Sequence, residues 1–519
     1  MLALTDQDKP LSAKMIRNVG FGGLRALLLA PVPFLLTPLI LAKTGTRGYG
    51  TWAILVTMNS LTSLADLGLL GTLSKYVAEY HAHQDFPRLR RLLSTGMAVF
   101  GLLASLIVIL LWIASSWVVT LLFRGSALSN PELLLLFHGS LILMWLNIVT
   151  FLSSSVTSGL QRLDLTNMIA VGNVICAALG GAVFLFMGWG VRGLLYANIG
   201  AAILTLMTYT VLVRKLIPQV TINPLRADIE EAKKIFAFSW RMYLVQAAGA
   251  IQNHFEKLTL GFFVGVVPVG WYDIASDSAT KIRGIPSLLL TPVLPAAAEL
   301  VAKGEESKLV ELYYRVHKYL AFLAVPLVFF CVAISARFVE LWIGPSLTVV
   351  ARPLCILLVV NLIALMTGPG YMIFVGRGLL AQGVYSVLTG LVLGVPLSIF
   401  LIFRYGFAGA VVGMSTSSVT ASVVFLFLFH RQKQYAIGRL FREAYLQPVT
   451  CSVALLALEF IVRPSSGLSW MGLIVQGGVF LLLYVLVMLS TSFFDGYDWG
   501  KIESVWPIVR LAKRIAPAG

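Results

Sequence analysis

The chain has 519 residues, of which 58% are hydrophobic and 12% are charged, and its formal net charge is +16. Its mean hydropathy is +0.88. A soluble globular protein carries about 25% charged residues, so this composition excludes that class and indicates a polytopic membrane protein. The cysteines and histidines form no CxxC, HExxH or other metal-binding spacing, so we expect no metal and no cofactor.

Apolar runs long enough to cross a bilayer follow one another along the whole chain. A spanning helix needs about 20 apolar residues, and on that criterion we predict an all-α fold with about 14 transmembrane helices. Their expected ranges are 18–42, 50–73, 93–117, 133–157, 168–189, 193–213, 236–265, 269–298, 319–341, 353–375, 381–403, 407–429, 446–463 and 470–491. Gly190 and Gly406 lie at two of the breaks. The residues before the first run are polar and lack a signal-peptide cleavage site, so that run is expected to be a true span.

Basic residues and tryptophans predict the orientation of these helices. With the N-terminus inside, most lysines and arginines of the connections fall on the cytoplasmic side, where such residues are enriched. Indole rings prefer the membrane interface. The tryptophans at predicted outer ends of spans are Trp52, Trp117, Trp189, Trp271, Trp342 and Trp470. Both termini are therefore predicted to be cytoplasmic.

Two pairs of short stretches resemble each other at a spacing of roughly 220 residues, as in transporters built from two related halves. Gly188–Leu195 resembles Arg404–Val412. Likewise, Arg47–Trp52 resembles Val269–Ile274. We therefore expect two six-helix lobes as parallel repeats, followed by two C-terminal helices. The predicted domains are an N-terminal lobe (1–213), a cytoplasmic linker (214–235), a C-terminal lobe (236–429), helices thirteen and fourteen (430–491) and a cytoplasmic basic tail (492–519).

Two of the predicted helices, 236–265 and 269–298, carry an unusual number of charges and are expected to be joined by a tight turn at 266–268. Asp273, Asp277 and Lys281 recur every four residues and so share one helix face. Charges at membrane depth are costly and usually face a bundle interior or a wet cavity. Two interpretations remain open: a water-filled groove between the helices, or ion pairs that only fix their packing.

The charged residues within predicted spans form two candidate sets. The cations expected to bind substrate in a central cavity are Arg25, Lys257, Lys281, Arg283 and Arg241. The acids expected to respond to a coupling ion are Glu256, Asp277, Asp66 and Asp273. Alternatives stay open for three of them, because Arg241 can snorkel to the headgroups, Asp273 can be interfacial and Asp66 can serve only as helix glue. The positive bias suits an anionic headgroup such as a phosphate or pyrophosphate.

Several stretches occur in the order that a known family shows. They are TRGYGTWAILVTMNSLTSLADLGLLGTLSKYVAEYHAH, SGLQRLDLTN, EKLTLGFFVGVVPVGWYDIAS, PVLPAAAELVAKGE, WIGPS and GRGLLAQGVYS. With them the chain resembles the polysaccharide-transport branch, the O-antigen and exopolysaccharide flippases, of the multidrug, oligosaccharidyl-lipid and polysaccharide (MOP) flippase superfamily.

The resemblance implies two lobes around a cavity that opens alternately to each side of the membrane. The implied substrate is a polyprenyl-pyrophosphate-linked oligosaccharide, moved to the outer leaflet of a bacterial cytoplasmic membrane and coupled to H⁺ or Na⁺. Arg25 resembles a cavity-lining arginine of related flippases. Glu256 and Lys257 match the family's acidic and basic pair, although Asp is the commoner acid there. Implied partners are membrane lipids and assembly proteins such as a glycan polymerase, with no nucleic acid.

The rival functions are those of other transporters with the same fold and those of membrane enzymes. A lipid II flippase and a multidrug exporter have the same fold, but drug efflux favours a less cationic cavity. A membrane glycan polymerase or ligase generally needs a substantial outer loop, whereas the longest outer connection expected here runs only from Trp117 to Glu132. We therefore predict a transporter and not an enzyme. A scaffold for glycan assembly would not require charge inside the membrane.

Overall fold

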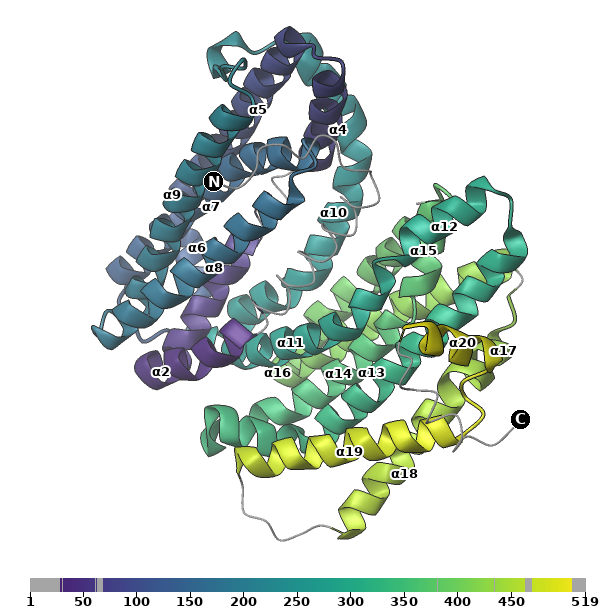
Figure 1. Ribbon diagram of the computed structural model, residues 1–519. Helices are drawn as coiled ribbons and strands as arrows, with labels where there is room; N and C mark the ends of the chain where they lie inside the picture. The colour runs from purple at the N-terminus through teal and green to yellow at the C-terminus, as the bar shows by residue number, and fades with distance from the viewer. Residues whose placement is uncertain are drawn as a thin grey trace. The chain divides into compact units, whose positions relative to one another are not determined.

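The computed structural model describes residues 29, 31–60, 62, 69–379, 381–433, 435–462 and 469–505. Regular structure within these residues is entirely helical (Figure 1). Nine segments among them are helical, long and apolar enough to cross a membrane: Phe86–Ile113, Asn130–Gly159, Leu163–Phe186, Gly190–Leu216, Val266–Ala302, Glu306–Ile343, Pro345–Gly376, Tyr385–Lys433 and Trp470–Ser490. The prediction of an all-α polytopic membrane protein is confirmed. The total of about 14 spans stays a prediction.

The chain divides into two compact units. The first comprises Met1–Asp273 with Ile399–Ala410, and the second comprises Ile274–Ser398 with Val411–Gly519. The first contains α2 (Pro31–Ser60), α4 (Leu69–Ala82), α5 (Phe86–Ile113), α6 (Ser115–Leu122), α7 (Asn130–Gly159), α8 (Leu163–Phe186), α9 (Gly190–Leu216), η1 (Pro224–Arg226) and α10 (Ile229–Phe263). The predicted division into two six-helix lobes stays a prediction.

Two helices, α11 (Val266–Ser287) and α16 (Ala381–Lys433), contribute residues to both units. The remaining helices belong to the second unit. They are η2 (Leu288–Leu290), α12 (Val293–Ala302), α13 (Glu306–Ile343), η3 (Pro345–Val350), α14 (Ala351–Leu365), α15 (Gly368–Gly376), α17 (Ile437–Leu440), η4 (Phe441–Tyr445), α18 (Leu446–Val462), α19 (Trp470–Ser490) and α20 (Gly496–Val505).

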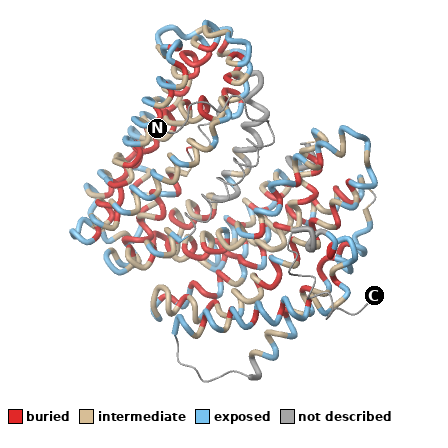
Figure 2. The backbone as a smooth tube through the Cα atoms, in the orientation of Figure 1, coloured by how far each residue is buried: buried red, intermediate tan, exposed pale blue. Residues whose placement is uncertain are grey.

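Exposed apolar stripes identify the sides of helices that suit lipid. On α8, Ile175 is 42% exposed, Leu179 64% and Val183 57%. Their four-residue spacing places them on one face of the helix. Buried and exposed residues alternate along many of the helices (Figure 2). An apolar face of this kind would be unfavourable in water but matches hydrocarbon, which agrees with a membrane-spanning role.

Each unit has its own buried core. In the first, side chains of α4, α5 and α7 interlock around Leu73, Phe100 and Ile148, all completely buried. In the second, aromatic rings of α13, α15 and α16 pack together, with the Tyr313 and Phe429 rings stacked at a centroid distance of 4.9 Å. These cores hold the helices in fixed positions, because large buried side chains in contact resist sliding.

The breaks predicted at Gly190 and Gly406 are present, and both glycines have a φ of 56°. Gly190 begins α9, whereas Gly406 interrupts the long α16. Positive φ is readily available to glycine and strained for other residues. The two glycines occupy matching positions of Gly188–Leu195 and Arg404–Val412 and have the same φ value. The repeat itself stays a prediction.

The turn between α10 and α11 lies two residues earlier than predicted. We expected it at 266–268, but α10 ends at Phe263 and α11 begins at Val266. The reversal occurs at Gly265, whose φ of 118° requires a glycine. Pro268 is instead inside the first turn of α11, where a missing N–H group costs nothing. The proline therefore marks the start of a helix and not the turn.

Helices α2 and α11 approach each other closely through two glycines. A Cβ atom on Gly50 would lie 1.9 Å from the carbonyl oxygen of Val266, and one on Gly270 would lie 3.2 Å from the Gly50 Cα atom. Gly50 and Gly270 come from the two stretches, Arg47–Trp52 and Val269–Ile274, that resemble each other in sequence. Small residues permit such backbone contact between membrane helices. The two matched stretches therefore meet in the first unit.

Substituting Gly50 with alanine should destabilise the protein. Because the added methyl group would overlap backbone and not a flexible side chain, we expect a cost of about 1–3 kcal/mol or a loss of folded protein. Thermal unfolding in detergent measures the effect. Gly101→Ala in α5 is the control, since a Cβ atom there meets open space. Equal melting temperatures for the two variants would contradict the close approach.

Candidate functional site

The first predicted site residues that the structure brings together are Lys257 of α10 and Asp273 of α11. The Lys257 Nζ and Asp273 Oδ1 atoms are 2.6 Å apart. The Tyr49 hydroxyl of α2 donates a hydrogen bond of 2.9 Å to the other carboxylate oxygen. The Lys257 and Asp273 side chains are only 13% and 16% exposed. Desolvation of such a pair is costly, and hydrogen bonds like that from Tyr49 offset part of the cost.

Glu256 lies beside this pair in the chain but in a different environment. It is 4% exposed, and its Oε2 atom has no hydrogen-bond partner among the described residues. Tyr272 lies within electrostatic range of Glu256 and is itself almost fully buried. A buried carboxylate oxygen without a hydrogen-bond partner is unfavourable, and a bound proton or cation would relieve that cost. Among the predicted acids that the structure describes, Glu256 therefore has the environment best suited to ion binding.

The predicted residues of the second unit are Asp277, Lys281 and Arg283, all on α11. Lys281 and Asp277 form the expected ion pair across one helical turn. Arg283 is partly buried and forms no ion pair with any residue that the structure describes. Arg283 is thus the cation of this set whose charge is not neutralised by a described acid.

Three of the predicted site residues are not placed. Arg25 and Asp66 lie outside the described residues. Arg241 lies on α10, but its side chain is not described. Their assignment to a cationic cavity or to ion coupling stays a prediction.

A cavity that the sequence did not indicate lies among α2, α7, α8 and α9 of the first unit. Its volume is about 240 Å³, and its polar lining residues are Asn59, Ser60, Asn147, Asn173 and Asn198, with Trp52 at its wall. One asparagine comes from each of the four helices. The asparagines are far apart in sequence and form no motif, so only the spatial arrangement brings them together.

A second hollow, of about 690 Å³, lies near the start of α7 and α9. Glu132 and Arg192 form an ion pair there, beside Trp189 and Tyr196. Trp189 was predicted at an outer end of a span, as expected for an interfacial indole ring. A charged pair beside two aromatic rings suits the boundary between hydrocarbon and water.

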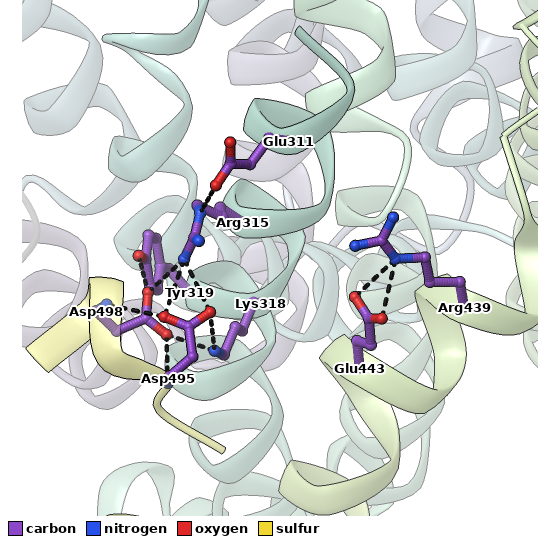
Figure 3. Close-up of polar contacts among 8 residues, drawn as sticks. All are labelled: Glu311, Arg315, Lys318, Tyr319, Arg439, Glu443, Asp495 and Asp498. Carbon is purple, nitrogen blue, oxygen red and sulfur yellow. Dashed lines mark hydrogen bonds and ion pairs between the residues drawn. The ribbon is translucent and has the colours of Figure 1, made fainter. Parts of the chain in front are cut away.

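A charged cluster in the second unit joins α13 to the chain after α19 (Figure 3). Asp498 of α20 is 1% exposed and accepts from Arg315 at 2.9 Å, from Lys318 and from the Tyr319 hydroxyl. Arg315 also bonds Asp495 at 3.2 Å. Sequence reasoning counted these cations only as evidence of orientation. The DxxD spacing that opens α20 is the local signal that was missed.

The start of α20 is a reciprocal cap that fixes this cluster. The Asp495 amide donates to Asp498 Oδ2 at 3.1 Å, and the Asp498 amide donates to Asp495 Oδ1 at 2.9 Å. Partial burial alone would raise the pKa of Asp495, but the Asp498 amide, Lys318 and Arg315 together hold that pKa below its ordinary value. The ionised cluster therefore ties α20 to α13.

The pair of Lys257 and Asp273 should show strong coupling in a double-mutant cycle. Lys257→Met or Asp273→Leu alone leaves a buried charge without its partner, so each should cost about 3–5 kcal/mol. The double variant should cost much less than the sum. The exposed pair of Glu299 and Lys303, treated in the same way, should change the melting temperature little. Additive losses at Lys257 and Asp273 would show that the two do not interact.

Removal of the Asp498 carboxylate should release the C-terminal segment. In Asp498→Ala, Arg315 and Lys318 lose their buried counter-ion, so limited proteolysis should cut after α19 several-fold faster than in the wild type. Glu443→Ala serves as the control, because it breaks only the exposed pair with Arg439 shown in Figure 3. Unchanged cleavage of Asp498→Ala would contradict an anchoring role.

Comparison with known proteins gives a family match and a fold match. A family model described as "Polysaccharide biosynthesis protein" matches residues 15–301. No curated protein matches the sequence. The solved structure of the lipid II flippase MurJ in an inward closed conformation has a TM-score of 0.68 and 12% identity, covering 92% of this chain and 98% of that one.

Two transporters of the MATE type have related structures. An inward-facing multidrug resistance MATE transporter of the MOP superfamily has a TM-score of 0.60 and 15% identity, over 79% of this chain and 98% of that one. A mutant of the MATE transporter VcmN from Vibrio cholerae has a TM-score of 0.53 and 13% identity, over 82% and 99%. At these identities the likeness concerns the fold.

Proposed function

Because the chain belongs to the polysaccharide biosynthesis protein family and has the fold of MOP transporters, we propose that it flips a polyprenyl-pyrophosphate-linked oligosaccharide across a bacterial cytoplasmic membrane. Family and fold both support a transporter over an enzyme. The glycan would travel from the inner to the outer leaflet by alternating access, with both termini of the protein in the cytoplasm.

The structural observation that carries this proposal is the absence of an acidic partner for Arg283 among the described residues. Lys257 and Lys281 are matched by Asp273 and Asp277, whereas Arg283 has no ion pair among the described residues. A cation at membrane depth that is not neutralised is unfavourable unless an anion reaches it. Its guanidinium group can bind two oxygens of a phosphate at once. We therefore assign Arg283, together with Arg25, to the pyrophosphate.

Ion coupling is assigned to Glu256, with Asp277 and Asp66 as further candidates. Glu256 is supported by its burial and by the Oε2 atom that has no partner in the described part of the chain. Binding of H⁺ or Na⁺ would stabilise this carboxyl group. Asp277 and Asp273 already bind lysines, so a role for them in coupling would require those pairs to open. No cofactor enters this proposal.

A lipid II flippase is the second candidate function. The MurJ structure has a TM-score of 0.68 to this chain, and its stated substrate is also a lipid-linked glycan. A pyrophosphate-binding arginine serves both substrates equally, so the two functions differ in the sugar. A multidrug exporter is less well supported, because a cation such as Arg283 repels cationic drugs. Partners such as a glycan polymerase would belong to the oligosaccharide function.

Loss of either pyrophosphate-binding arginine should abolish most transport. In a strain whose glycan export depends on this protein, Arg25→Ala and Arg283→Ala should each lower export at least about tenfold, because charge-assisted hydrogen bonds to phosphate are lost. Export is measured as surface glycan at matched protein levels. Arg226→Ala is the control, since Arg226 is exposed in η1 outside the predicted spans. Normal export by both variants would overturn the proposal.

A further inference from the structure

We propose that the asparagine-lined cavity of the first unit, among α2, α7, α8 and α9, is a sugar subsite that holds one neutral, hydroxyl-rich ring of the transported glycan. The inference rests on the proposed function for the identity of the ligand. It adds a second recognition element, because the cations discussed above would bind the pyrophosphate and not the sugar.

Three of the four asparagines that line the cavity come from the interior of helices long enough to span a membrane. Asn147 lies near the centre of α7, and Asn173 and Asn198 lie well inside α8 and α9. Asn59 lies in the last turn of α2. These four helices pack on one another within the first unit. The positions of the four carboxamides are therefore set by the packing of the unit.

The carboxamides keep unused hydrogen-bonding capacity. The Asn59 amide donates to the Leu55 carbonyl at 3.1 Å, while its Oδ1 atom is buried without a partner among the described residues. Asn198 likewise donates to a carbonyl one turn earlier, at 2.8 Å. Asn147 makes no hydrogen bond with any residue in the described ranges. Each carboxamide offers two donors and an oxygen acceptor, so much of this capacity faces no protein group.

Helix glue does not account for the arrangement. Asparagines that join membrane helices bond across the helix interface. Here only Asn173 does so, donating to Thr205 of α9 at 2.8 Å. Asn59 and Asn198 bond within their own helices. Polar groups without protein partners at membrane depth are costly, and a polar ligand in the cavity would satisfy those of Asn147 and Asn198, whereas the Asn59 Oδ1 atom is sealed from it.

The lining chemistry favours a sugar over an ion. Every lining residue is uncharged, so the cavity neither attracts the pyrophosphate nor supplies a carboxylate to a metal ion. Sugar hydroxyls both donate and accept, which matches the carboxamides and Ser60. Trp52 offers a flat apolar ring to the C–H face of a pyranose. The volume of about 240 Å³ is below the range of about 300–1,000 Å³ for drug-sized ligands, which suits one ring.

The test compares a polyprenyl pyrophosphate with and without an attached disaccharide. Three disaccharides are used, whose first ring is a hexose, an N-acetylhexosamine or a 6-deoxyhexose. The wild-type protein in detergent should bind at least one glycosylated lipid more tightly than the bare one. Asn147→Leu should weaken that binding about tenfold, the loss expected for buried hydrogen bonds, and leave the bare lipid unchanged. Trp52→Leu should act in the same direction.

The matched control is Asn361→Leu on α14. Asn361 donates to the carbonyl four residues earlier at 2.9 Å, as Asn198 does, but does not line the cavity. The Asn361→Leu variant should bind both the bare and the glycosylated lipid as tightly as the wild type does. Unchanged binding of the bare lipid by Asn147→Leu shows that this variant is folded. Asn198→Leu replaces it if Asn147→Leu does not fold.

Several results would overturn the inference. One is equal wild-type affinity for bare and glycosylated lipids, and another is glycan binding that neither Asn147→Leu nor Trp52→Leu weakens. A third is Na⁺ binding that Asn147→Leu abolishes while glycan binding persists, which would make the cavity a cation site. Failure of the wild type to bind any of the lipids would instead contradict the proposed function. The subsite would then be judged by methyl glycosides, which must protect the wild type and not Asn147→Leu against heat.

Discussion

The high cost of an unpaired polar group in hydrocarbon governs the arrangement of this protein. Some buried charges are matched: Lys257 forms an ion pair with Asp273, and the Tyr49 hydroxyl donates a hydrogen bond to the same carboxylate. Where a group is left without a described partner, as at Arg283 and at the Glu256 Oε2 atom, structure alone gives no reason for its presence. The groups that packing does not explain are therefore the ones to which transport is assigned.

Pyrophosphate and sugar pose different recognition problems, and the chain offers different chemistry for each. A pyrophosphate is common to all lipid carriers of this type, so an arginine that binds it gives affinity without selecting the glycan. Uncharged carboxamides form hydrogen bonds that depend on where the sugar carries its hydroxyl groups, and an indole ring packs on the apolar face of the ring. Together they can discriminate between sugars. Selectivity among lipid-linked glycans would then depend on Asn59, Asn147 and Asn198 more than on the cations.

Local sequence patterns predicted what lies within one helix. The apolar runs predicted the all-α membrane fold. Breaks in those runs predicted helix interruptions at Gly190 and Gly406, and the four-residue spacing of Asp277 and Lys281 predicted their ion pair. Contacts between distant segments have no such periodic signal. The hydrogen bond from Tyr49 to Asp273 joins residues 224 positions apart, and the asparagine cavity needs four helices. These contacts depend on which helix faces pack against each other, and no local sequence pattern predicts that.

The most direct test of the account is a flipping assay with purified protein in liposomes. A polyprenyl-pyrophosphate oligosaccharide is placed in both leaflets, and its exposure to a membrane-impermeant glycosidase is followed with and without an imposed proton or sodium gradient. The account predicts that the protein makes the inner-leaflet glycan accessible far faster than in protein-free liposomes, and that one of the gradients changes the rate. Glycan exchange no faster than in protein-free liposomes, under either gradient and at full reconstitution, would contradict it.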